Sequence, residues 1–85
     1  MSVEEIEEQV RVILADVFGL EPEAIGPQTS AETVEGWDSL QHLTVVLALE
    51  EEFDIHLDDE EAIAAVTFPS ITAIVRDHLE TLRPG

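Results

Sequence analysis

The chain has 85 residues, with 20 acidic side chains, three arginines, no lysine and no cysteine, and its formal net charge is −17. This length predicts one domain over residues 1–85 with a small core, because so short a chain buries only about 60% of its unfolded surface. The lack of cysteine excludes disulfides and thiolate metal sites, and the negative charge argues against nucleic acid or an anionic membrane as a partner.

The acidity does not prevent folding, since 45% of the residues are hydrophobic and they fall in periodic runs. No run reaches the roughly 20 apolar residues of a transmembrane helix. The N-terminus has neither the cationic nor the apolar region of a signal peptide. We therefore expect a cytoplasmic monomer whose partners present basic patches.

Residues 3–18 have the periodicity of a helix with one apolar face. Ser2 and Glu5 are spaced as a capping box, and Gly19 is placed to end the helix in a left-handed conformation. The apolar face comprises Val3, Ile6, Val10, Ile13, Leu14, Val17 and Phe18.

Residues 20–38 form a connection longer than most loops, and such loops are often functional. Prolines and glycines recur along it. Leu20, Ile25 and Val34 are its expected anchors to the core, with room for a helical turn at residues 23–25.

The remaining chain predicts three more helices, over residues 39–53, 59–65 and 71–82, capped in the first case by Asp38 and in the last by Ser70. Arg76 and Arg83 suit the C-terminal half of the last helix. Its expected inner face is Ile71, Ile74, Val75, His78, Leu79 and Leu82. Because no segment alternates as a strand does, the fold class is all-α: a four-helix bundle with three longer helices and a short third, and a long loop between the first two.

Ser39 is the candidate for chemistry. As the first residue of a helix capped by Asp38, it should expose its hydroxyl beside backbone N–H groups that lack helical partners. Those donors and the helix dipole favour a phosphate, so Ser39 could carry a phosphodiester. The position alone also fits an ordinary helix start.

The helix that follows Ser39 is apolar on two sides. His42, Val45, Val46, Leu49 and Phe53 form a stripe that we expect to be core. Leu40, Leu43 and Leu47 form a second stripe, which is either a docking face beside Ser39 or buried under neighbouring segments. Trp37 is either a hydrophobic staple at the helix start or a partner contact.

No metal site or catalytic group is predicted. Residues 54–65 are acidic, but the glycine and glutamate that an EF-hand needs are replaced by Asp59 and Ala65. The three histidines lack metal-ligand spacing, and His42 and His78 fall on apolar stripes, which favours packing roles.

The stretch Asp38-Ser39-Leu40, the helix ending Leu49-Glu50-Glu51-Glu52-Phe53, and the acidic segment after it closely resemble the acyl carrier proteins. The likeness covers essentially the whole chain in length, helix order and loop placement. It implies that a phosphopantetheinyl transferase, using magnesium, joins the 4′-phosphopantetheine of coenzyme A to the Ser39 hydroxyl. The thiol of that arm would then hold an acyl group as a thioester and present it to partner enzymes.

The resemblance assigns further roles. Asp38 would cap the helix and help the transferase recognise the site, and Leu40 would contact it. The fatty-acid carriers usually have acids in the turns after the serine, where this chain has Gln41 and Thr44. We therefore expect the partner enzymes to belong to a specialised pathway. The expected partner contacts are Trp37, Leu40, Gln41, Leu43, Thr44 and Leu47.

The cargo could be a polyketide-like acyl chain or an amino acid, each with its own loading ligase and downstream acyl-transferring enzymes. Met1, together with helices that nearly fill the chain, favours a discrete carrier over an excised domain. The alternative from another class is an acidic helical adaptor without a prosthetic group, in which the leucine stripe alone makes the interaction.

Overall fold

Hydrogen bonds fix both ends of the first helix, α1 (Val3–Phe18). The Glu5 carboxylate accepts from the Ser2 N–H, and the Ser2 hydroxyl accepts from the Glu5 N–H, both at 3.2 Å. The backbone bond from Ser2, reinforced by the Ser2 side chain, lowers the pKa of Glu5. Gly19 has a φ of 68° and donates its N–H to the Ala15 carbonyl. The predicted capping box and glycine stop are therefore confirmed.

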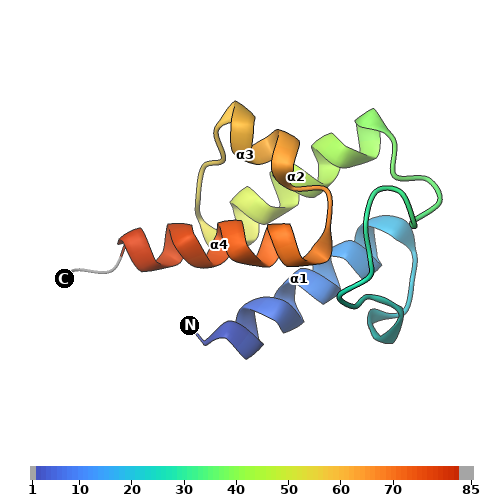
Figure 1. The fold of residues 1–85 in the computed structure, drawn as a ribbon, viewed down its shortest axis with the longest axis horizontal. Coiled ribbons are helices and arrows are strands. Elements are labelled where there is room, and N and C mark those ends of the chain that lie inside the picture. Colours follow the sequence, from blue (N-terminus) through green and yellow to red (C-terminus); the bar gives the residue numbers. More distant parts are fainter. Residues whose placement is uncertain (1, 83–85) are drawn as a thin grey trace.

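The computed structural model describes residues 2–82, and the side chains of residues 2–80. The single turn η1 (Pro22–Ala24) and the helices α2 (Ser39–Phe53), α3 (Asp59–Ala64) and α4 (Phe68–Leu82) follow α1 (Figure 1). Across the described residues there is no strand, only an isolated bridge between Ser30 and Thr67. The all-α prediction, with a short third helix and a long first connection, is confirmed. None of the helices within residues 2–82 is long and apolar enough to cross a bilayer.

The last helix begins earlier than predicted, at Phe68 instead of residue 71. Pro69 fits in its first turn, where a missing N–H costs no helical hydrogen bond. Thr67 precedes the helix: its hydroxyl accepts from the Ser70 N–H at 3.0 Å, and the Ser70 hydroxyl accepts from the Thr67 N–H at 3.2 Å. The predicted cap at Ser70 is therefore wrong, because Ser70 lies within the first turn. Arg83 lies outside the described residues.

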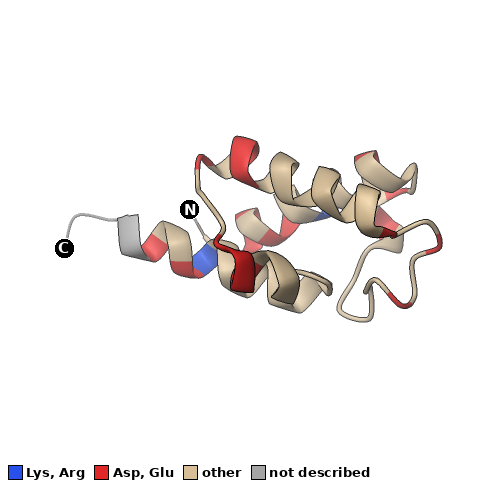
Figure 2. Cartoon of the chain, turned by 90° about the horizontal axis from the view of Figure 1, so that it is seen from above, with Lys and Arg blue, Asp and Glu red and all other residues tan. Residues whose placement is uncertain are grey.

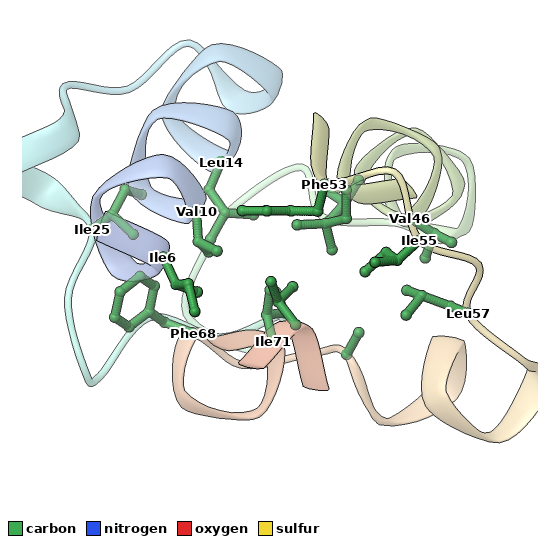
Figure 3. Close-up of a cluster of buried hydrophobic side chains, with 14 of the residues drawn as sticks. Ile6, Val10, Leu14, Ile25, Val46, Phe53, Ile55, Leu57, Phe68 and Ile71 are labelled. Carbon is green, nitrogen blue, oxygen red and sulfur yellow. The ribbon is translucent and has the colours of Figure 1, made fainter. Parts of the chain in front are cut away.

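The four helices enclose one apolar core, seen in Figure 3 as side chains that converge from α1, α2 and α4. The most deeply buried members are Ile6, Val10, Leu14, Val45, Leu49, Ile71 and Val75. α3 contributes no buried residue, although Leu57 and Ala65 on either side of it are buried. Burial therefore fixes the residues that flank α3 more firmly than the residues of α3.

The predicted core faces are largely confirmed. Val3 is the exception on α1, at 46% exposed. On α4, Ile71 and Val75 are buried while the other predicted positions are half-buried, apart from Leu82, whose side chain lies outside those described. Three helices thus bury the stripes that their sequence periodicity marks.

The long loop is anchored mainly by contacts that the sequence did not predict. Ile25 is buried and Val34 packs against the core, as expected, but Leu20 is 41% exposed, so the prediction for Leu20 is wrong. Thr29 is buried instead, and its hydroxyl accepts from the Gly26 N–H at 2.9 Å.

Backbone bonds tie the loop to the connection that precedes α4. Ala31 N–H donates to Val66 O at 2.8 Å, and Phe68 N–H donates to Thr29 O at 2.9 Å. The loop is therefore held as one wall of the end of the bundle where α2 begins.

Arg11 makes a second tie between the loop and the helices. Its Nε donates to the Ile25 carbonyl at 3.2 Å, and its guanidinium carbon lies 5.3 Å from the centre of the Phe68 ring. One side chain on α1 thereby contacts both the loop and the first residue of α4.

We expect Arg11→Met to lower the free energy of unfolding by about 1–2 kcal/mol, because it removes a hydrogen bond and a cation–π contact. The control is Arg76→Met, at an exposed position on α4, which should change stability by less than about 0.5 kcal/mol. Urea denaturation measures both, and equal midpoints for the two variants would contradict the assignment.

Candidate functional site

The site is built on the start of α2. The Asp38 carboxylate accepts from the Gln41 N–H at 2.9 Å, and the Asp38 carbonyl accepts from the His42 N–H at 2.8 Å. Asp38 is extended, with a φ of −103°, so it is the predicted N-cap. Ser39 follows as the first helical residue and is exposed.

The first two amides of α2 are available to an anion. Among the hydrogen bonds of the described residues, none is donated by the N–H of Ser39 or of Leu40. The positive end of the helix dipole lies at the same place. An exposed hydroxyl beside two such donors is suited to carry a phosphodiester, which is what the sequence predicts for Ser39.

Trp37 packs under this helix start. Only 9% of the residue is exposed, and its ring centre lies 5.0 Å from that of Phe18. Its indole Nε1–H donates to His42 Nδ1 at 3.1 Å. Of the two roles that the sequence allowed, the packing role agrees with this burial.

His42 connects the helix start to α3. Its Nε2 lies 2.6 Å from the Ala62 carbonyl oxygen. The sequence predicted packing for His42 but gave no signal for this bond, because Ala62 lies 20 positions away and contributes only its backbone.

A shallow open hollow of about 390 Å³ lies beside Ser39. Three segments line it: the long loop, the first turn of α2 and the connection between α3 and α4. The lining residues are Ala31, Trp37, Asp38, Ser39, His42 and Val66. The hollow provides a mixed polar and apolar surface next to the serine hydroxyl.

The second leucine stripe faces solvent. Leu40 is 73% exposed, and Leu43 and Leu47 are each 54% exposed. The alternative that they are buried by neighbouring segments is therefore wrong. Ile63 on α3 is exposed too, at 74%, and was not singled out from the sequence because α3 is too short for a clear stripe.

The polar neighbours of this stripe differ in exposure. Thr44 is exposed and its hydroxyl donates to the Leu40 carbonyl at 3.2 Å, while Gln41 is half-buried. We call Leu40, Leu43, Thr44 and Leu47 the leucine face.

The acids lie away from the start of α2. Residues 39–49 contain no charged side chain, and acids occupy residues 50–52. Figure 2 shows the same division, with α2 uncharged until its last turns. The half-buried Glu50 carboxylate accepts from the Leu57 N–H at 2.8 Å, so it also organises the turn that leads to α3.

The other histidines contact acids. His78 on α4 lies 2.8 Å from the Glu61 carboxylate on α3, and the largely exposed His56 lies 3.2 Å from Glu50. No group of His, Cys, Asp and Glu within the described part of the chain could hold a metal ion.

Known proteins match the part of the chain that contains these residues. The family model described as "Phosphopantetheine attachment site" matches residues 8–76, which include every residue that lines the hollow. The chain is 40% identical over 62 residues to an acyl carrier protein of Thermosynechococcus vestitus (strain NIES-2133 / IAM M-273 / BP-1). That alignment covers 73% of this chain and 76% of the relative.

Substituting the two adjacent residues should separate capping from chemistry. We expect Asp38→Ala to lower the free energy of unfolding by about 1 kcal/mol, since the Gln41 N–H loses its acceptor. Ser39→Ala should change it by less than about 0.5 kcal/mol, since the serine is exposed. Thermal or urea denaturation measures both, and a larger loss for Ser39→Ala would mean that Ser39 has a structural role.

Proposed function

The chain belongs to the acyl carrier proteins, which are carriers and not enzymes and bear a covalently attached 4′-phosphopantetheine, and we propose that Ser39 is the residue that bears it. The observation that carries this assignment is the exposed Ser39 hydroxyl at the capped start of α2. The amides of Ser39 and Leu40 lie beside that hydroxyl and can donate to a phosphodiester on it.

The residues around Ser39 fit the group. The Asp38 carboxylate is engaged by the Gln41 N–H, so it stabilises the helix start on which the phosphate depends. Trp37 and Val66 give the hollow apolar walls, against which an extended arm can lie. The arm supplies a terminal thiol, to which cargo is joined as a thioester, and this chain has no cysteine of its own.

The test of attachment uses the absence of cysteine from this chain. Incubated with coenzyme A, magnesium and a broad-specificity phosphopantetheinyl transferase, the protein should gain the mass of one 4′-phosphopantetheine and one free thiol. Intact mass and a thiol assay measure this. Ser39→Ala should gain neither, whereas Ser2→Ala, at another exposed serine that begins a helix, should gain both.

Each unexpected outcome overturns a different claim. No gain by the wild type would refute attachment of the group and favour the adaptor alternative. A gain that persists in Ser39→Ala would refute Ser39 as the attachment site but not the attachment itself.

The leucine face is the part of α2 that we assign to partners. It starts next to Ser39, and it is apolar on a helix whose acids begin only at Glu50. Partner enzymes, including the transferase and the enzymes that load and accept cargo, would cover these leucines while the flanking acids steer basic patches towards them. Gln41 is half-buried beside this face and would make polar contact at its edge.

The uncharged first half of α2 also bears on the cargo. Gln41 and Thr44 stand where the fatty-acid carriers usually have acids, so recognition would depend on apolar contact more than on charge. This supports service in a specialised pathway, with a polyketide-like acyl group as cargo and an aminoacyl group as the alternative.

We expect Leu43→Ala to raise the KM of the carrier in the transferase reaction by about three- to tenfold, which corresponds to roughly 1 kcal/mol of lost contact. Val12→Ala is the matched control, because Val12 is 50% exposed but lies on α1. Neither substitution should shift the urea midpoint. An unchanged KM for Leu43→Ala would contradict the assignment of this face.

A further inference from the structure

A chain of two hydrogen bonds crosses the end of the bundle beside Ser39. The Trp37 indole Nε1–H lies 3.1 Å from His42 Nδ1, and His42 Nε2 lies 2.6 Å from the Ala62 carbonyl oxygen. The chain joins the end of the long loop and the start of α2 to α3, whose Ala62 lies 20 positions from His42 in sequence. We call these three residues the His42 latch.

The partners at each end determine where the imidazole carries its proton. The indole N–H can only donate, so Nδ1 must offer a lone pair. The Ala62 carbonyl can only accept, so Nε2 must carry a hydrogen. Both bonds form together in one protonation state alone, the neutral Nε2–H tautomer.

We propose that the His42 latch is a proton-sensitive device that holds the wall of the hollow beside Ser39, with His42 as a positioning residue. A second proton on His42 would occupy Nδ1 and turn an N–H towards the indole N–H. The bond from Trp37 would then be lost, and the two donors would be placed against each other.

The loss would act on Trp37 in the wall of the hollow and not on α3. α3 has six residues and none of them is buried, so hydrogen bonds provide much of its attachment. On its other side, Glu61 is held by His78 of α4. That contact survives in either state of His78, because a neutral Nε2–H can still donate to the carboxylate. The bond from His42 Nε2–H to the Ala62 carbonyl likewise persists in either state of His42, so protonation would release the Trp37 side of the latch and leave α3 attached.

No nearby charge offsets a proton on His42. Across the described residues, no carboxylate oxygen lies within 4.0 Å of its ring nitrogens. On α2 the residues from Ser39 to Leu49 are uncharged, and Asp38 at its start is engaged as the cap. From α3 the nearest acid in sequence is Glu61, which is paired with His78 on α4, and in the loop Glu35 is exposed. The His42 latch therefore responds to the protonation of His42 and not to that of a neighbouring acid.

The latch lies where the proposed attachment residue is. His42 follows Ser39 by three residues, so the two lie on one side of α2, and both line the hollow with Trp37. Protonation would alter the wall against which any group on Ser39 rests. The inference goes beyond the carrier function, since the two bonds exist in the unmodified chain.

Trp37 is the chain's only tryptophan and there is no tyrosine, so the fluorescence and the indole N–H resonance come from this one residue of the latch. When the pH is lowered until His42 gains its second proton, both signals should change together. The hydrogen-exchange protection factor of the indole N–H should fall about five- to tenfold in step, as expected for one lost hydrogen bond, whereas the protection factors of α3 should not change.

Three histidine variants show which residue causes the pH response of Trp37. His42→Gln should abolish the response of Trp37, because the amide does not titrate. His56→Gln and His78→Gln should retain it, and His78→Gln is the sharper control because His78 also contacts α3. Trp37 signals that do not change with pH in the wild type, or a response lost in His78→Gln, would overturn the proposal.

A measurement on the wild type guards against misfolding of a variant. At pH of about 8, the ¹⁵N shifts of His42 should show an unprotonated Nδ1 and a protonated Nε2. The opposite tautomer would overturn the proposal, whatever the variants do.

Discussion

The hydrogen bond from the Gln41 N–H to the Asp38 carboxylate sets where α2 begins, and the rest of the site depends on that start. It leaves Ser39 in the first turn, with an exposed hydroxyl. Because each helical residue turns by about 100°, the same start directs His42 towards Trp37 and Ala62 and leaves the leucine face in solvent. A start displaced by one residue would rotate every one of these side chains away from its partner.

The leucine face follows from how the helices pack around the core. α2 uses one side for the core, through Val45, Leu49 and Phe53, and α1 and α4 close the core without covering the opposite side. Within residues 2–82 no other element covers Leu40, Leu43 and Leu47. Exposed apolar surface lowers solubility, and the acids on either side of the face offset this effect. The same surface is where an interface can form.

Local signals predicted the parts of the fold that depend on local physics. The capping box at Ser2, the stop at Gly19 and the cap at Asp38 each involve residues within a few positions, so the sequence alone identifies them. The start of α4 was missed because Pro69 is as compatible with a first helical turn as with a break. The anchoring of the loop by Thr29 and the bond from His42 to Ala62 were missed because they join segments distant in sequence through backbone groups, which leave no pattern.

The predicted and the missed features differ in strength as well as in range. The core is held by buried side chains such as Leu49, whose truncation costs about 2–5 kcal/mol. The walls of the hollow are held largely by single hydrogen bonds to backbone carbonyls, each worth about 1 kcal/mol: Ala31 to Val66 on one side and His42 to Ala62 on the other. Local opening follows the weakest attachments first. The surroundings of Ser39 can therefore rearrange while the three longer helices, and the start of α2 with them, stay in place.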